Sequence, residues 1–159
     1  MVLLYKEYHA PWILDKSPHT GKPKTQTRRL WEKCRVRIGS VHQARTRLFD
    51  KTSTFCLQRI LNTWPETLRE MSEEDAVAEG YPDKKSFLVA LFEINRIKTP
   101  DLDREIWAVE YEVVKKKCKY CGRKGPSKTL VKGVGFFCNE GCYDRYIEQE
   151  NIRKGRASR

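Results

Sequence analysis

Four cysteines toward the C-terminal end have the spacing of metal ligands. Cys118 and Cys121 form one pair, Cys138 and Cys142 form another, and sixteen residues separate the two pairs. The turn at Gly122 lets the first two thiolates approach one ion, and the second pair falls where we expect a helix to begin, so that the helix dipole favours thiolates. Four sulfur ligands complete the tetrahedral shell of Zn²⁺. We therefore expect one structural zinc ion, with free thiols or disulfides as the alternative.

A basic loop at residues 21–29 is the second stretch that could do chemistry. Four of its nine residues are cationic, and Gly21 and Pro23 indicate an irregular backbone rather than a helix. The loop offers charge-assisted donors to phosphate, together with hydroxyl groups that could bond to a base. A solvated basic turn is the alternative. The nucleic-acid-binding residues that we expect here are Lys22, Lys24, Thr25, Thr27, Arg28 and Arg29.

Arginines at a two-residue spacing follow this loop. Residues 35–41 are expected to form a strand with Val36 and Ile38 inside, and a second strand with the same alternation is expected around residue 46. Arginines that point outward from two strands could extend one phosphate-binding face, although they are also common as plain solubility features. The four outward positions are Arg35, Arg37, Arg45 and Arg47.

The charge of the chain favours a polyanionic partner. The 159 residues carry a formal charge of +11, which fits nucleic acid or an anionic membrane surface. Residues 16–59 (+10) and 114–159 (+9) flank an acidic segment, 60–113 (−7). The longest apolar run, Phe87 to Phe92, is too short to span a bilayer, so we expect a cytoplasmic protein without a membrane segment. In that compartment cysteines are metal ligands or free thiols more often than disulfides.

Hydrophobic periodicity predicts the strands and helices that must position these residues. Their order along the chain predicts an α+β fold. A first strand within residues 2–8 is followed by a turn that packs Trp12 and Leu14 inward. Ser72 and Asp75 form a capping box that begins a helix, and Gly80 is a natural residue to follow its end. The remaining expected elements are a strand at 55–61, a helix at 82–95 and a strand at 106–113 that alternates strictly.

Glu79 is unusual for its place in the last turn of the first of these helices. A carboxylate there opposes the helix dipole by roughly 0.3–1 kcal/mol. A cation nearby would offset that cost, so the position suggests that Glu79 has a partner elsewhere in the chain.

Three of these features together resemble the ASCH domain. They are Lys24 to Arg29, a helix that ends at Glu79, Gly80 and Tyr81, and the closing strand 106–111. The resemblance covers roughly residues 1–113 and implies a PUA-like fold, a small β-barrel flanked by short helices and associated with RNA. One departure is that Gly39 precedes Ser40, where many ASCH domains have an aspartate.

The resemblance also implies a candidate catalytic set. Some small bacterial members of the family hydrolyse the amide of N4-acetylcytidine, and the matching positions here are Lys24, Thr27 and Glu79. A threonine hydroxyl becomes a useful nucleophile only with a base nearby, which the lysine or the glutamate could provide. Those enzymes are single short domains, whereas this chain has a second module, so we expect binding rather than catalysis.

The second module resembles treble-clef fingers of the L24e and TRASH type, on the residues from Phe136 to Cys142. Such fingers contact nucleic acids and proteins alike. Within the cysteine module, residues 131–137 are expected to form a hairpin held by Gly133 and Gly135. The expected organisation is an ASCH domain at 1–113, a basic linker at 114–117, a zinc finger at 118–150 and a disordered basic tail at 151–159.

Three functions are consistent with these patterns. The first is RNA binding by two basic modules, with a nucleotide or nucleoside as a further candidate ligand. The second is a nucleoside or RNA-processing hydrolase, similar to the acetylcytidine amidohydrolases or to a ribonuclease. The third is an adaptor whose zinc finger binds a protein partner. Salt dependence separates the first from the third, because phosphate binding weakens steeply with salt.

Overall fold

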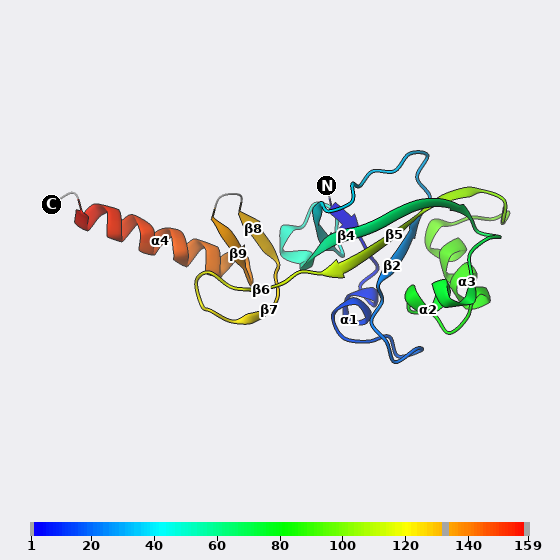
Figure 1. The fold of residues 1–159 in the computed structure, drawn as a ribbon, viewed down its shortest axis with the longest axis horizontal. Helices are drawn as coiled ribbons and strands as arrows, with labels where there is room; N and C mark the ends of the chain where they lie inside the picture. Colours follow the sequence, from blue (N-terminus) through cyan, green and yellow to red (C-terminus); the bar gives the residue numbers. More distant parts are fainter. Residues whose placement is uncertain (1, 132–133, 158–159) are drawn as a thin grey trace. The chain divides into compact units, whose positions relative to one another are not determined.

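A computed structural model describes residues 2–131 and 134–157 of the chain (Figure 1). The chain divides into two compact units. The loop unit comprises Tyr5–Val41 and Arg59–Glu112, and the cysteine unit comprises Met1–Leu4, His42–Gln58 and Val113–Arg159. None of the helices that the structure describes has the length and apolar character that crossing a bilayer requires.

The main sheet has five strands in the order β1-β3-β4-β5-β2. β1 pairs with β3 in parallel, and β2 pairs with β5 in antiparallel register, with Thr27 opposite Val109 and Arg29 opposite Trp107. The mixed α+β class is therefore confirmed. No closed barrel is found among the described residues, where the five strands form one sheet with β1 and β2 at its two ends. The strands are β1 (Val2–Leu4), β2 (Gln26–Arg29), β3 (Val41–Arg45), β4 (Thr54–Thr67) and β5 (Glu105–Val113).

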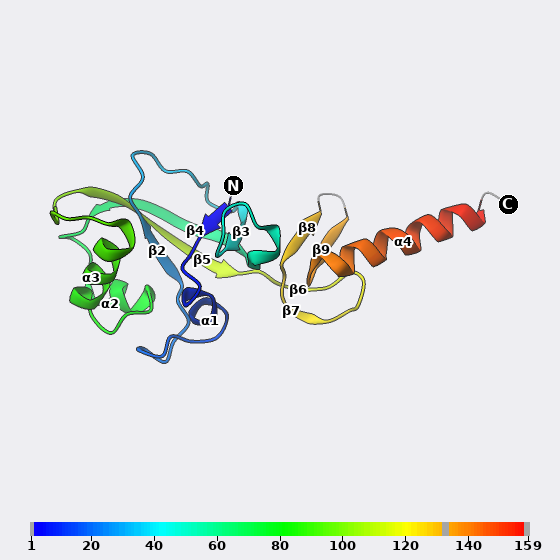
Figure 2. The ribbon, with the colours of Figure 1, turned by 180° about the vertical axis from the view of Figure 1, so that it is seen from behind.

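The loop unit packs three helices against its part of the sheet. They are α1 (His9–Leu14), α2 (Glu73–Ala78) and α3 (Lys84–Asn95), and Figures 1 and 2 show α2 and α3 side by side. Large apolar side chains from these helices and from the strand ends form one core, which gives the unit a rigid frame for its polar residues. The core comprises Trp12, Leu68, Met71, Ala76, Tyr81, Phe87, Leu91 and Ile106.

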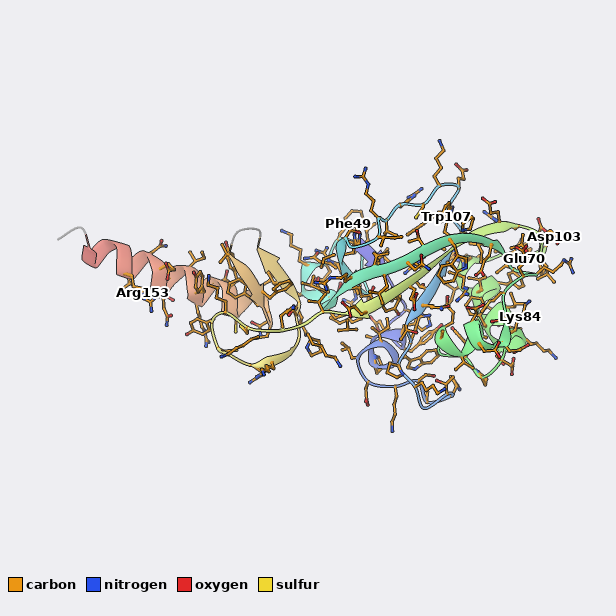
Figure 3. The ribbon with its side chains drawn as sticks, viewed as in Figure 1. Phe49, Glu70, Lys84, Asp103, Trp107 and Arg153 are labelled. Carbon is orange, nitrogen blue, oxygen red and sulfur yellow. The ribbon has the colours of Figure 1, made fainter. Side chains whose placement is uncertain are left out.

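Side-chain caps begin α2 and α3, and the cap of α2 is the predicted one. Ser72 and Asp75 form the predicted capping box at the start of α2. Asp83 caps α3 by accepting from the backbone N–H of Ser86, and Lys84 (Figure 3) donates to the backbone carbonyls of Arg69 and Met71, which precede α2. Gly80 follows α2 at φ +90°, and a Cβ there would lie 2.9 Å from Cε3 of Trp12. Only glycine fits this turn without displacing the tryptophan.

Two expectations about the arginine-rich strands are wrong. Residues 35–40 form no strand, because Gly39 turns the chain at φ +80° and β3 begins only at Val41. Val36 is buried as expected, but Ile38 is 64% exposed. Arg45 does not point outward, because its guanidinium donates to the Thr54 hydroxyl at 3.0 Å and to the side-chain oxygen of Gln43.

The cysteine unit contains two small hairpins and a long helix (Figure 2). β6 (Lys115–Lys117) pairs with β7 (Lys124–Pro126), and β8 (Thr129–Val131) pairs with β9 (Gly135–Phe137). This second hairpin matches the predicted one, although Gly133 lies outside the described residues. The unit also includes η1 (Lys51–Ser53) before β4 and the helix α4 (Glu140–Ala157).

Ordered elements replace the predicted linker and tail of this unit. Residues 115–117 form β6, and Val114 before them is buried. Residues 151–157 continue α4, where the sequence predicts a disordered tail. An ion pair one turn apart, from Arg153 to Glu150 at 3.2 Å, supports the helix there. Residues 158–159 lie outside the described residues.

Candidate functional site

The basic loop is tied to two helices of the loop unit before it enters β2. Gly21 turns the chain at φ +66°, as its composition predicts. The backbone N–H of Lys24 then donates to the carbonyl of Trp12 at 2.8 Å, and that of Thr25 donates to the carbonyl of Ala78 at 2.9 Å. These bonds hold the loop between α1 and the end of α2. They direct Lys24 toward the interior, whereas Lys22 stays exposed.

Lys24 and Glu79 meet inside the loop unit. The Lys24 ammonium donates to the Glu79 backbone carbonyl at 2.9 Å and to its carboxylate oxygen Oε2. The two side chains are 1% and 3% exposed. Burial lowers the pKa of Lys24, while the adjacent Glu79 carboxylate acts in the opposite direction. The positive charge of the ammonium offsets the unfavourable interaction between the Glu79 carboxylate and the helix dipole. This explains how a carboxylate is accommodated at the helix end.

Arg28 extends this pair into a buried ion cluster. Its Nε lies 2.8 Å from Oε1 of Glu66, and its Nη2 lies 2.9 Å from Oδ1 of Asp75. Nη1 donates to the Gln26 side chain at 2.6 Å and lies 3.7 Å from Oε1 of Glu79. The Arg28 side chain is 0% exposed, so it is engaged inside the protein and not displayed to solvent. We call Lys24, Arg28, Glu66, Asp75 and Glu79 the ion cluster.

Sequence reasoning missed two members of the ion cluster. Asp75 was recognisable as a helix cap, and its second carboxylate oxygen takes that role by accepting from Ser72 while Oδ1 contacts Arg28. Glu66 carries no local signal, since its partner Arg28 is 38 positions away. Trp64 orients it by donating from Nε1 to Oε2 at 3.2 Å.

The side chains of Thr27 and Arg29 project from the opposite face of β2 to those of Gln26 and Arg28, because side chains alternate along a strand. Thr27 is 5% exposed, and the contacts described for Lys24 and Glu79 do not include it. The Arg29 guanidinium carbon lies 4.8 Å from the centre of the Tyr5 ring. Nε and Nη2 of Arg29, and Nε1 of its cross-strand neighbour Trp107 (Figure 3), are buried without an acceptor among the described residues.

His9 has a structural role beside this face. Its Nε2 lies 3.2 Å from the Tyr81 hydroxyl, and it is 8% exposed. Burial, together with the positive charges of Lys24, Arg29 and Lys6, lowers the pKa of His9 to about 2. The imidazole is therefore neutral at ordinary pH.

The other predicted nucleic-acid-binding residues separate by exposure. Arg45 is 8% exposed and occupied by internal hydrogen bonds, so it does not extend a surface. Arg47 lies 3.9 Å from Asp50 as an exposed ion pair. The positions that face solvent are Lys22, Thr25, Arg35, Arg37 and Arg47.

The four cysteines meet in the cysteine unit. Cys118 and Cys121 lie on the turn between β6 and β7, which Gly122 closes at φ +72°. Cys138 follows β9, and Cys142 lies in the first turn of α4, where its backbone N–H donates to the Asn139 side chain at 2.8 Å. Two short hairpins and one helix start thus bring residues from both pairs to one point.

The cluster fits a tetrahedral metal ion. All four sulfur atoms lie within 4.8 Å of one another, with Cys121 and Cys138 at 3.7 Å and Cys138 and Cys142 at 3.3 Å. A zinc ion with four sulfur ligands places sulfur atoms about 3.8 Å apart. The four are free cysteines, so the predicted alternative of disulfides is not what the structure has. Burial disfavours the Cys118 thiolate, but backbone N–H groups of Cys121 and Cys138 outweigh it and lower its pKa to about 6.

The surface around the cysteines is strongly basic. Residues 113–139 contain eight Lys and Arg residues and no acidic residue, a signal that the sequence alone could have revealed. The seven whose exposure the structure describes all face solvent, and no ion pair is described for them. They are Lys115, Lys116, Lys117, Lys119, Arg123, Lys124 and Lys128. Phe137, which is 0% exposed, forms the small core beneath them with ring contacts to Tyr143 and Tyr146.

Comparisons with known proteins add one structural likeness. A crystal structure of an ASCH domain from Lactobacillus crispatus superposes with a TM-score of 0.41 and 17% sequence identity. The superposition covers 56% of this chain and 63% of that chain. A scan of protein-family models and a search of curated proteins find no match.

Proposed function

We propose that this protein binds nucleic acid, with RNA as the expected ligand. The observation that carries the proposal is the basic segment 113–139, whose described cations are exposed and have no carboxylate within the segment to neutralise them. Exposed lysine and arginine side chains can displace the counterions of a phosphate backbone. Arg35 and Arg37 add exposed positive charge on the loop unit.

The loop unit would act as an ASCH-like binding module in this proposal. The resemblance of Lys24–Arg29 and of Glu79–Tyr81 to that family supports it. Arg29 and Trp107 supply buried N–H groups that have no acceptor among the described residues. A base carbonyl or a phosphate oxygen would reach those donors only after neighbouring side chains move, because the atoms are buried. Arg28 and Lys24 would support the site from within, since both are held in the ion cluster.

Zinc is the metal we propose for the four-cysteine cluster. Cys118, Cys121, Cys138 and Cys142 would hold it, and four thiolates prefer a soft or borderline ion such as Zn²⁺. A closed shell of protein ligands leaves no position for substrate. The ion would therefore stabilise the cysteine unit and take no part in a reaction.

Salt dependence of RNA binding tests the proposal. We expect the logarithm of affinity of the full chain for single-stranded RNA to fall linearly with the logarithm of salt, with a slope of about −0.7 for each phosphate contact. Removal of Arg123, Lys124 and Lys128 by alanine should weaken binding and flatten the slope. The matched control removes three exposed cations of the loop unit, Lys85, Lys98 and Arg104. No measurable RNA affinity, or binding that salt leaves unchanged, would contradict the proposal.

Hydrolysis of an acylated nucleoside is the second candidate function. The contact between Lys24 and Glu79 favours it, because these are two of the three residues that the family resemblance implies. A nucleophilic Thr27 would need a base within about 2.6–3.2 Å, directly or through water, and neither residue contacts it here. Incubation with N4-acetylcytidine tests this activity. If the protein is an enzyme, Glu79→Gln abolishes turnover and leaves nucleoside affinity largely intact at temperatures at which circular dichroism shows the variant to be folded, and Thr27→Ser retains turnover.

A further inference from the structure

An open groove lies beside the first cysteine pair, entirely within the cysteine unit. Its volume is about 700 Å³, and its lining combines lysines with aromatic residues. The side chains that matter here are those of Lys116, Lys117, Lys119, Tyr120 and Phe136. The groove is as large as many ligand sites, and its wall includes three lysines but no aspartate or glutamate.

The lysines beside the groove oppose one another. Lys117 on β6 pairs directly with Lys124 on β7, and both are exposed. Like charges at directly opposite positions destabilise a two-stranded pair, so this arrangement costs stability unless an anion neutralises it. No acidic side chain occurs between residues 113 and 139 to do so. The groove is therefore complementary to an anionic ligand from outside the segment.

Aromatic residues give the groove a second kind of contact. Phe136 and Tyr120 are half-buried, so part of each side chain remains accessible. The backbone N–H of Lys119 donates to the carbonyl of Phe136 at 2.9 Å, which fixes β9 against the cysteine turn. The Lys119 ammonium donates to the Val134 carbonyl at 3.0 Å and lies 5.3 Å from the centre of the Tyr146 ring. Positive charge and aromatic surface are thus held at one place.

We propose that this groove binds single-stranded nucleic acid, with Lys116 and Lys117 contacting phosphates and Phe136 stacking on a base. This inference rests on the proposed function and names the place and the form of the ligand. An aromatic ring can stack only on a base whose face is exposed, which a duplex does not offer along its length. Lysines along the same groove follow the backbone that connects such bases. RNA and DNA single strands share this chemistry.

Two sets of variants of the zinc-loaded full chain test the groove. The first set, which we call the charge pair, is the double variant Lys116→Ala/Lys117→Ala. Its control is the double variant Lys85→Ala/Lys98→Ala, which removes two exposed lysines of the loop unit. The stacking pair is Phe136→Leu and Phe136→Tyr, of which only the second keeps an aromatic ring. Each protein is titrated by fluorescence anisotropy against oligouridine, oligothymidine and the duplex of oligouridine with oligoadenosine. Polyglutamate is added as a competitor.

We expect the charge pair to reduce the salt slope for a single strand by about 1.4, two contacts of about 0.7 each. Its control should leave the slope unchanged. Phe136→Leu should weaken single-strand binding by about 5- to 150-fold, and Phe136→Tyr should restore it. Duplex affinity should be nearly the same in both Phe136 variants. Comparable affinity for oligouridine and oligothymidine would place the recognition in phosphates and bases and not in the sugar.

Each contrary result rules out a specific part of the proposal. If wild type binds RNA but the groove variants match their controls, the groove is not the site, and the proposed function stands. If Phe136→Leu weakens duplex and single strand equally, the ring does not stack on unpaired bases. If polyglutamate displaces oligouridine at equal charge concentration, the groove is an acidic-protein site. If wild type binds no nucleic acid, both the inference and the proposed function fail.

Discussion

The two most buried cations among the residues whose exposure is described, Lys24 and Arg28, lie in the basic loop, for which the sequence also allowed a solvated basic turn. Each is surrounded by carboxylates: Glu79 holds Lys24, and Glu66 and Asp75 hold Arg28. A buried charge without a partner costs several kcal/mol, whereas a paired one can be tolerated. The loop sequence therefore shows that these residues are charged, but not whether their side chains are buried or exposed. The cations that remain for a phosphate are those without such partners.

At the scale of single residues, loss of Glu79 should destabilise the fold. Glu79→Gln leaves the Lys24 ammonium buried beside a neutral amide, so we expect the free energy of unfolding to fall by about 3–5 kcal/mol. Adding Lys24→Met should recover most of that loss, because Arg28 keeps Glu66 and Asp75. Urea denaturation of the two single variants and the double variant measures this. A double variant as unstable as the sum of its single changes would show that the two side chains are not coupled.

At the scale of elements, α2 links helix capping to the ion cluster. One oxygen of Asp75 closes the capping box with Ser72, and the other contacts Arg28. A helix of six residues has little stability of its own, so this end of the helix depends on the tertiary contact as well as the cap. The position of Glu79 at its far end depends on the same frame.

Asp75→Ala should therefore cost more than an ordinary cap. Loss of a helix cap typically costs about 1 kcal/mol, and the unpaired Arg28 adds to this because it is buried. Asp83→Ala is the matched control, since Asp83 caps α3 through Ser86 and has no ion pair among the described contacts. Thermal unfolding of both variants compares the two costs. Equal losses would mean that the Asp75–Arg28 contact contributes no stability.

At the scale of the whole molecule, we expect the cysteine unit to depend on the proposed metal for its folding. Phe137 is its one fully buried aromatic residue among those described after residue 118, with Tyr143 and Tyr146 beside it, which is too small a core to fold residues 118–150 unaided. Binding of the ion supplies the folding free energy in such domains.

Chelation should therefore unfold residues 118–150 and leave the loop unit folded. Elemental analysis should find one zinc ion per chain, and Cys142→Ser should lose it. Cys34→Ser is the control, because Cys34 lies outside the cluster and donates only to the Val36 carbonyl. Backbone amide spectra before and after chelation show which residues lose their order. An ordered cluster without bound metal would contradict this prediction.

The sequence by itself determined the features whose partners lie close along the chain. The capping box spans Ser72 to Asp75, and each cysteine pair lies within five residues, so the local backbone decides both. The strict alternation of 106–113 is equally local, and β5 follows it. The basic segment 113–139 is visible from composition alone. In each case short-range geometry or charge count is sufficient.

Only the tertiary structure decided which charges are internal. Lys24 and Glu79 are 55 positions apart, and Arg28 and Glu66 are 38 apart. Whether a lysine or an arginine in such a loop faces water depends on whether the fold brings a carboxylate to it, because desolvation is tolerated only with a partner. The same reason explains Arg45, which a two-residue period places outside and which hydrogen bonds to Thr54 and Gln43 hold inside. Periodicity predicts which side chains share a face of a strand. Whether that face is buried or exposed depends on the neighbours that the fold places against it.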